Sequence, residues 1–347
     1  MVEDGERVLV VDGNSLVHRS YHALAGTGYR SVLGRPIWAV RGLLTQVVAA
    51  VERVQPTRVV VGFDDPARSE RRDRWPAYKA HRADKPPTLV AQLAMAAEQL
   101  QRLGVHVVTP PGLEADDVLA SVARWTDERG GRTVVVTSDR DAFALITERT
   151  SVLRVIHGGI EGSPLLTPER LELMAGVPPY QYRDLAALRG DPSDNLPGVE
   201  GIGPKRAALL LARFGSAEAV FVAVAEEPDA VAAVVGPGCV ARLGRPEARA
   251  NWRRNIDLMT FVDDLDCGLG EATPVGRLPL DADDVHRVLV GHGLPATAQL
   301  GRRVLGGVHE PAEAPPSVDH LGWDSRAEWH GRVTMPPLPV SPQPALF

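Results

Sequence analysis

The stretch RVLVVD at residues 7–12 decides the fold class. Its four consecutive apolar residues, three of them valine, end directly on an acid, Asp12. Such a run is typical of a strand buried on both faces of a parallel sheet. Similar runs stand at residues 58–63, 105–108 and 133–137. Because helical spacing fills the intervals between them, the sequence predicts an α/β fold whose parallel sheet has helices on both faces.

The pattern changes from about residue 167, after which no further strand is predicted. Residues 152–156 are compatible with one more edge strand, and residues 307–347 contain eight prolines, which favours an extended tail. The helices are predicted at residues 41–54, 89–103, 115–129, 168–175, 180–188 and 204–214. The chain thus divides into an α/β region, a helical region and a tail.

Composition excludes several classes of protein. The 347 residues are 44% hydrophobic, with two cysteines and no apolar run near the 18 residues that a membrane helix needs. The N-terminus lacks the apolar segment of a signal peptide, so we expect a soluble, cytoplasmic protein that contacts no membrane. A net charge of −6 speaks weakly against nucleic-acid binding, yet residues 68–85 hold seven Lys or Arg against three acids.

Acids follow each predicted strand, at the edge where open α/β sheets bind ligands. These acids, with two from the helical region, are Asp12, Asp64, Glu114, Asp116, Asp117, Asp139, Asp141, Asp191 and Asp194. Singly, each has an ordinary explanation in a turn or a helix N-terminus. Together they would repel one another unless cations neutralise them. An all-oxygen set of this size predicts two ions of Mg²⁺ or Mn²⁺, an arrangement suited to displacement at phosphorus.

The turn GIGPK at residues 201–205 separates two predicted helices and is typical of a helix–hairpin–helix. Gly201 and Gly203 would expose backbone N–H groups to a phosphate, and Lys205 and Arg206 would add positive charge. An ordinary interhelical turn is the alternative, but beside nine acids the pattern favours DNA binding.

Other motifs give weaker evidence of function. The glycines of GVEGIG at residues 198–203 are spaced in reverse order for a dinucleotide fingerprint and follow no strand, and the chain has no P-loop sequence. His18 and His22 are spaced to hold zinc from one helix, but no third soft ligand stands near them, so a pair on a helix surface is the better interpretation.

Five segments resemble the structure-specific 5′ nucleases, the flap endonucleases and the 5′→3′ exonuclease domain of bacterial DNA polymerase I. They are LVVDGNSLVHRSYHAL, VGFDD, GLEADDVLAS, TSDRD and GDPSDNLPGVEGIGPKRA, and they contain all nine acids. The similarity covers roughly residues 7–300. It implies a PIN-like nuclease core at 1–178 with a helical arch at about 66–88, a helical helix–hairpin–helix region at 179–306, and a separate tail at 307–347.

The resemblance also implies roles for further residues. RRDRWPAYKAHR resembles the arch segment, in which Arg71, Lys79 and Arg82 would act at the scissile phosphate and Tyr78 would meet the 5′ strand. A K⁺ ion would bind the backbone carbonyls near Val199 and Ile202. The expected reaction is metal-dependent hydrolysis of DNA at 5′ ends and flaps in replication and repair, leaving a 5′-phosphate. No polymerase region follows residue 347, so we expect a free-standing, monomeric nuclease.

Two other functions stay open, and one further partner is suggested. A DNA-junction-binding protein of the same fold would lack some acids, and a PIN-like ribonuclease would use the helix–hairpin–helix differently. QPALF at residues 343–347 resembles the peptide with which bacterial proteins dock on the DNA sliding clamp, a Gln followed by a Leu-Phe pair. An accidental match in a polar tail is the alternative.

Overall fold

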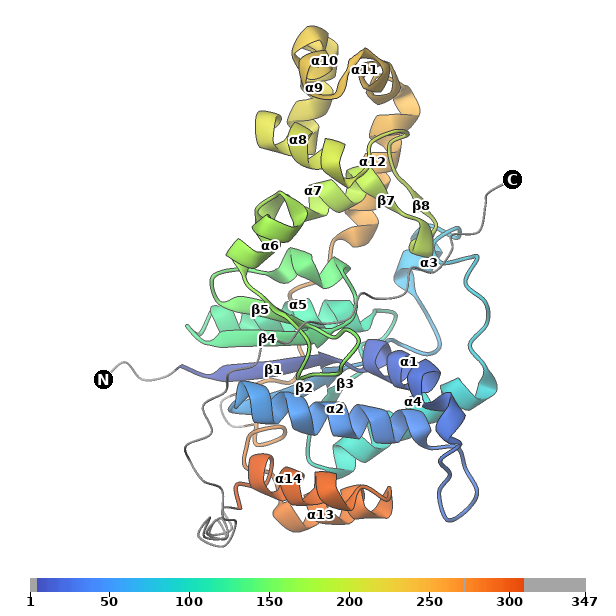
Figure 1. Cartoon of the computed structure of the whole chain (residues 1–347), viewed down its shortest axis with the longest axis vertical. Coiled ribbons are helices and arrows are strands. Elements are labelled where there is room, and N and C mark those ends of the chain that lie inside the picture. The colour runs from blue at the N-terminus through green and yellow to red at the C-terminus, as the bar shows by residue number, and fades with distance from the viewer. Residues whose placement is uncertain (1–4, 271–272, 309–347) are drawn as a thin grey trace, which may run out of the picture. The chain divides into compact units, whose positions relative to one another are not determined.

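The core of the protein is a six-stranded sheet in the order β3-β2-β1-β4-β5-β6 (Figure 1). The computed structural model describes residues 5–270 and 273–308. The strands are β1 (Arg7–Asp12), β2 (Arg58–Gly62), β3 (His106–Val108), β4 (Arg132–Thr137), β5 (Thr150–Arg154) and β6 (Leu165–Leu166). All neighbours pair in parallel except β5 and β6, which are antiparallel. This confirms the predicted α/β fold with a parallel sheet.

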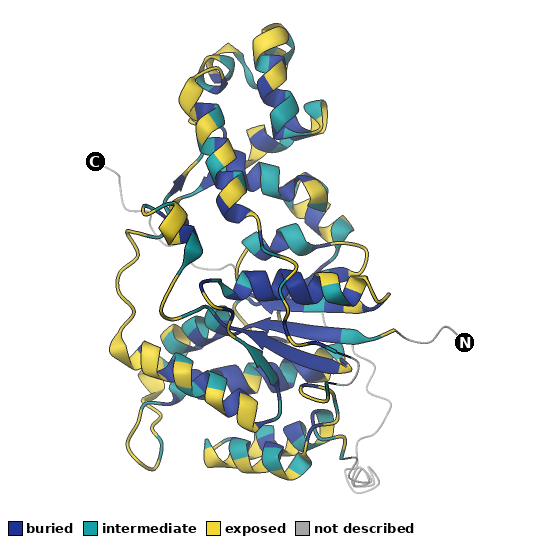
Figure 2. Ribbon diagram, turned by 180° about the vertical axis from the view of Figure 1, so that it is seen from behind, coloured by how far each residue is buried: buried dark blue, intermediate teal, exposed yellow. Residues whose placement is uncertain are grey.

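Strand β1 shows why the apolar runs make a sheet that is buried on both faces. Its side chains alternate, so that Val8 and Val10 belong to one hydrophobic cluster while Leu9 and Val11 belong to the other. All four are fully buried, and burying a side chain of this size contributes roughly 1.5–3 kcal/mol. Figure 2 shows the long strands β1, β2, β4 and β5 coloured as buried along most of their length, whereas β3 (His106–Val108) is intermediate.

Helices cover both faces of the sheet, as predicted. Helix α5 (Ala115–Asp127) contacts β1, β2 and β4, and its Val118 and Val122 join the cluster of Val8. Helix α2 (Trp38–Val54) contacts β1 and belongs to the opposite cluster. The other helical elements of this region are α1 (Gly13–Leu24), η1 (Ala25–Thr27), α3 (Glu70–Arg74), α4 (Pro87–Arg102) and η2 (Asp141–Leu145).

A helical region follows the sheet. Its elements are α6 (Pro168–Ala175), α7 (Pro179–Arg189), η3 (Pro192–Asp194), α8 (Pro204–Phe214), α9 (Ala217–Glu226), α10 (Pro228–Val235), α11 (Pro237–Leu243) and α12 (Pro246–Met259), with the short antiparallel pair β7 (Gly190–Asp191) and β8 (Leu196–Pro197). Helix α6 begins where predicted because Thr167 caps it and Pro168 occupies its first turn. Helix α7 contacts both η2 and α12, so it joins the two regions.

The last two described helices return to the sheet region. Helices α13 (Ala282–Gly291) and α14 (Pro295–Val304) pack on each other, and α14 contacts α2. The described residues up to 308 form one compact unit. The boundary at 178 therefore marks a change from sheet to helices rather than a separation between compact units, and it stays a prediction. Within the described residues no single helix is long and apolar enough to span a membrane, although the bent pair α8 and α9 together reaches that length and hydropathy.

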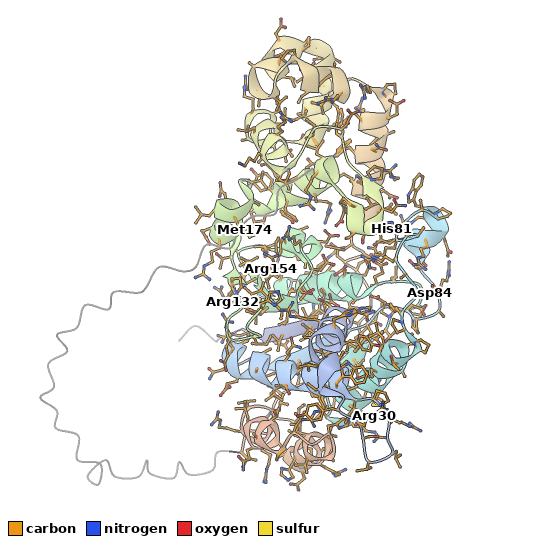
Figure 3. All side chains as sticks on the ribbon, turned by 45° about the vertical axis from the view of Figure 1, so that its right-hand side comes forward. Arg30, His81, Asp84, Arg132, Arg154 and Met174 are labelled. Carbon is orange, nitrogen blue, oxygen red and sulfur yellow. The ribbon has the colours of Figure 1, made fainter. Side chains whose placement is uncertain are left out.

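The predicted arch at about 66–88 contains little helix. Within it, only α3 and the first two residues of α4 are helical. Residues 75–86, which we call the arm, lead from α3 to α4 through turns and extended chain. His81 and Asp84 lie on its exposed part (Figure 3). The eight-proline tail and the QPALF segment lie outside the described residues.

Candidate metal and nucleic-acid site

Carboxylates from separate segments gather beyond the carboxyl ends of β1, β2 and β4. We call eight of them the acidic edge: Asp12, Asp64, Glu114, Asp116, Asp139, Asp141, Asp191 and Asp194. The parallel register explains the gathering, because Asp12 pairs with Gly62 at the end of β2 and Val11 pairs with Val136 near the end of β4. Each strand therefore delivers its following acid to the same edge.

Local hydrogen bonds fix the acids that leave β1 and β2. Asp12 caps α1 by accepting a hydrogen bond from the Ser15 N–H at 2.8 Å, and its second oxygen accepts one from the Thr137 hydroxyl at 2.8 Å. Asp64 accepts the N–H of Ala115 at 3.0 Å and the side-chain amide of Asn14 at 2.6 Å. Both carboxylates are thus oriented before any ligand binds.

Burial and mutual repulsion raise the pKa values of several of these acids. Burial, with repulsion from Asp64, raises the pKa of Asp12 to about 7. Burial, with repulsion from Asp139, raises the pKa of Asp141 to about 7. The pKa of Asp116 lies well above its usual value for the same two reasons. These carboxyl groups therefore lack enough positive charge around them within the chain itself.

Asp116 carries the clearest sign of a missing partner. Its Oδ1 atom is buried and has no hydrogen-bond partner among the described residues. A buried carboxylate oxygen without a partner suits a hard cation. In the described part of the chain, however, no three acidic, His or Cys side chains stand close enough to hold one ion as they are arranged. The donor chemistry fits a divalent cation, and ligation by three groups requires their side chains to move.

The arm supplies positive charge to the acidic edge. Lys79 Nζ lies 3.0 and 3.1 Å from the two carboxylate oxygens of Glu114 and 3.9 Å from Asp194, and Arg82 forms an ion pair with Asp194. Lys79 has a left-handed backbone, with φ at 55°, which costs about 1–3 kcal/mol in a non-glycine residue. Its N–H donates to the Asp194 carbonyl at 3.0 Å, and Asn195 donates to the Ala77 carbonyl at 2.8 Å. These contacts hold the arm against residues 191–195.

Three residues lie differently from what the resemblance implied. Arg71 and Tyr78 are only 4% and 5% exposed, so neither side chain can reach a DNA strand in this arrangement. Tyr78 donates to Glu114 at 3.1 Å, and Arg71 donates to both oxygens of Asp117 at 2.7 Å. Asp117 is fully buried and already accepts four hydrogen bonds, so it has no oxygen free for a cation.

The hairpin, residues 198–206, is the exposed counterpart of the acidic edge. Gly201 has φ at +78°, a conformation that favours glycine, and Gly201, Gly203, Lys205 and Arg206 are exposed. Helix α8 begins at Pro204, so its first N–H groups face outward from the turn. Lys205 has no ion-pair partner among the described residues, and Arg206 donates to the Gly201 carbonyl at 2.9 Å. The Val199 carbonyl, expected near K⁺, accepts the Ile202 N–H at 3.0 Å.

Sequence reasoning missed the polar residues that orient the acids. Thr137 ends β4 inside the TSDRD segment, and its hydroxyl both donates to Asp12 and accepts the Asp139 N–H at 3.0 Å. The side-chain amide of Asn14 holds Asp64 at two points: its nitrogen donates to the Asp64 carboxylate and its oxygen accepts the Asp64 N–H. Both residues lie inside motifs, two positions from an acid of the edge, and this proximity is the signal by which the sequence could have identified them.

Comparison with known proteins identifies the family. Residues 7–172 match the model of the 5′-3′ exonuclease N-terminal resolvase-like domain, and residues 177–269 match that of the 5′-3′ exonuclease C-terminal SAM fold. The chain belongs to the 5′-3′ exonuclease family.

Two curated relatives, both DNA polymerases I, agree with this assignment. The chain is 36% identical over 282 residues to DNA polymerase I of Mycobacterium tuberculosis, covering 81% of this chain and 30% of that protein. It is 41% identical over 218 residues to the thermostable DNA polymerase I of Thermus thermophilus, covering 63% and 25%. The chain therefore spans less than a third of the length of these curated relatives.

Solved structures share the fold at low identity. The T5 5′-exonuclease with bound zinc ions superposes with a TM-score of 0.59 at 18% identity, covering 86% of this chain and 98% of that one. The catalytic core of Rad2 in complex with a DNA substrate gives 0.56 at 14% identity, covering 88% and 93%.

Proposed function

We propose that this chain is a divalent-metal-dependent 5′→3′ exonuclease and flap endonuclease that hydrolyses DNA phosphodiesters and leaves 5′-phosphates. The observation that carries the proposal is the acidic edge, where carboxylates with raised pKa values lie against the cations of the arm. Membership of the 5′-3′ exonuclease family supports the reaction class. Structural relatives solved with metal ions and with DNA support the ligand classes.

The acidic edge would hold the metal, proposed as two ions of Mg²⁺ or Mn²⁺. Asp116, with its unpartnered oxygen, is the foremost ligand, and the other seven acids of the edge complete the candidate set. Bound divalent cations would activate a water molecule and offset charge on the scissile phosphate. Asp117 is left out because Arg71 and backbone N–H groups take both its oxygens.

The chain's own residues would bind and orient the DNA. The hairpin would hold a duplex phosphate through exposed N–H groups and Lys205, with K⁺ at its carbonyls as the resemblance implies. Lys79 and Arg82 stand where positive charge would stabilise negative charge that develops on a phosphate at the acidic edge. Thr137 and Asn14 would keep Asp12 and Asp64 oriented during the reaction.

The test uses three substrates with Mg²⁺ and, as control, with EDTA: 5′-flap DNA, 5′-recessed duplex DNA and single-stranded RNA. We expect metal-dependent cleavage of the DNA substrates, with products that a 5′-phosphate-dependent ligase can join. Tight binding of the flap without cleavage would instead identify a junction-binding protein. Cleavage of RNA alone would identify a ribonuclease.

A second, independent proposal concerns residues 343–347, QPALF, which lie outside the described residues. We propose that this segment docks a monomeric nuclease on the DNA sliding clamp, with Leu346 and Phe347 in an apolar pocket and Gln343 hydrogen-bonded. Titration of the clamp with the full chain and with a chain ending at Pro342 tests this. Equal affinities would refute it, and loss of binding with unchanged flap cleavage would support it.

A further inference from the structure

A buried ion pair joins the start of the arm to the helix that carries the acidic edge. Arg71 of α3 donates from both terminal nitrogens to the two oxygens of Asp117 on α5, each at 2.7 Å. Arg71 is 4% exposed and Asp117 fully buried. Such a fork-to-fork contact fixes relative orientation as well as distance.

The same two residues also hold the end of α12. Arg71 Nε donates to the Leu258 carbonyl at 2.9 Å and Nη2 to the Thr260 carbonyl at 3.2 Å. Asp117 accepts the Val262 N–H at 2.9 Å. On the next turn of α5, the Ser121 hydroxyl donates to the Val262 carbonyl at 3.1 Å. The chain that leaves the helical region is therefore fastened to α5 through this pair.

Asp117 also sets the first turn of α5. It accepts the Glu114 N–H at 3.0 Å, which completes the capping box with which Glu114 begins the helix. Glu114 and Asp116, the two acids of this turn that face the edge, thus take their positions from a residue that is itself bound to Arg71. We call Arg71 and Asp117 the tie.

The neighbouring residues Asp116 and Asp117 differ in the hydrogen bonds that their carboxylate oxygens accept. Asp117 has four donors on two oxygens, whereas Asp116 has a buried oxygen with none. Consecutive residues of a helix point about 100° apart, so one can face the edge while the other faces the helical region. Moving Asp117 onto a cation would leave the Arg71 guanidinium buried without its partner, which is costly.

We propose that Arg71 and Asp117 are positioning residues that hold the acidic edge at a fixed distance from the hairpin, and that Asp117 is not a metal ligand. The inference rests on the proposed nuclease function. If the hairpin binds the duplex and the acidic edge hydrolyses it, the tie determines which phosphodiester lies at the acidic edge. It connects α5, which carries Glu114 and Asp116, to the end of α12, and α12 packs on α7 beside the hairpin.

The test replaces both charges together, as Arg71→Met with Asp117→Leu. Apolar replacement of a whole buried ion pair is often neutral or stabilising, so this double variant keeps the fold while removing the tie. Asp116→Asn is the matched control, one residue away on the same helix. Circular dichroism and thermal melting check that each variant is folded.

The first readout is Mn²⁺ binding to the DNA-free protein, followed by electron paramagnetic resonance. Removing a residue outside the ligand set costs about 10-fold to 100-fold at most, so we expect a loss near the lower figure for the double variant and a greater loss than the upper figure for Asp116→Asn. An equal, complete loss in both would show that Asp117 is a ligand and overturn the proposal.

The second readout is the position of the cut on a 5′-flap substrate. The wild type should give one main product, whereas the double variant should spread its products over neighbouring positions. Its kcat should fall about tenfold or more, because small misplacements slow chemistry strongly, while KM stays near the wild-type value. An unchanged product pattern and kcat would overturn the positioning role.

Arg71→Lys is a second variant that retains the positive charge but cannot form the two parallel hydrogen bonds of the guanidinium group. It is measured in the same way if the double variant does not fold. It should also spread the products and leave Mn²⁺ binding near that of the wild type. A wild-type protein that cuts no flap would refute the proposed nuclease function. The comparison of Mn²⁺ binding would still decide whether Asp117 is a ligand.

Discussion

The acidic edge and the hairpin are built in opposite ways. Most acids of the edge are buried or half-buried, although Asp139 is exposed. Thr137, Asn14 and the arm hold some of these carboxylates, and several of their pKa values are raised. The hairpin exposes Gly201, Gly203 and Lys205, and offers backbone groups and charge directly to solvent. A site that stabilises developing charge benefits from excluding water, whereas a surface that grips a phosphate backbone needs only access.

This difference predicts that changes at the edge act on the rate and changes at the hairpin act on affinity. Four measurements test that division, beginning with the one expected to show the largest effect.

Asp139→Ala should abolish flap cleavage and leave flap binding within about tenfold, because DNA-backbone contacts elsewhere hold the duplex. Single-turnover cleavage and fluorescence anisotropy in Ca²⁺ measure the two properties separately. The exposed Asp84→Ala, in the arm but not in the acidic edge, is the control and should cleave normally. Cleavage by Asp139→Ala at the wild-type rate would remove this acid from the site.

Lys79→Ala should slow single-turnover cleavage by about 10²-fold or more, as expected when a cation that stabilises the transition state is lost. Its ammonium group is the one placed 3.0 Å from Glu114. Lys85→Ala, an exposed lysine six residues away, is the matched control. If the two variants lost rate equally, general charge on the arm would explain the effect and the specific position of Lys79 would not.

Lys205→Ala should weaken duplex binding and lower the slope of log affinity against log salt by about one, while the single-turnover rate at saturation stays unchanged. Arg213→Ala, at the other end of α8 and also exposed, is the control. A lower saturated rate with unchanged affinity would reverse the roles assigned to hairpin and edge.

The smallest expected effect is on stability in EDTA. Asp12 and Asp141 have pKa values of about 7 in the folded protein against 3.8 when unperturbed, so the folded state binds more protons between these values. The free energy of unfolding should therefore fall as pH rises through about 7, with the stabilisation fully present below about pH 4. We expect a Tm lower by a few degrees at about pH 8 than at about pH 6.

Asp12→Asn should weaken this dependence, because one of the two titrating carboxyl groups is removed while Asp141 remains. A Tm that rises with pH over the same interval would contradict the assigned shifts.

The sequence was sufficient to predict the parts of the molecule that depend on local patterns. The strand around Val8 follows from its apolar run, and α6 and α8 match their predicted ranges because Thr167 with Pro168, and Gly203 with Pro204, mark where the helices begin. The meeting of Asp12 with the acids after β2 and β4 followed from parallel pairing, which is a property of the fold class.

Contacts between segments that are distant in the sequence could not be predicted from local patterns. Arg71 and Asp117 are 46 residues apart, and nothing in either local pattern says that they meet. The arm was expected to be helical, but it consists of turns and extended chain. The contacts of Lys79 with Glu114 and of Arg82 with Asp194 join segments that are far apart in the sequence. The return of α14 to α2 likewise depends on packing over the whole chain.

The ion pairs between the arm and the acidic edge would compete with the binding of a metal ion. Lys79 and Arg82 occupy oxygens of Glu114 and Asp194, so a metal ion binding there would have to displace cations that are already in place. Under the proposed function, a DNA phosphate that attracted the same two side chains would free those oxygens. Metal and DNA would then strengthen each other's binding, and thermodynamic reciprocity would make the factor the same in both directions. Metal affinity measured without DNA would therefore be lower than the affinity with DNA bound.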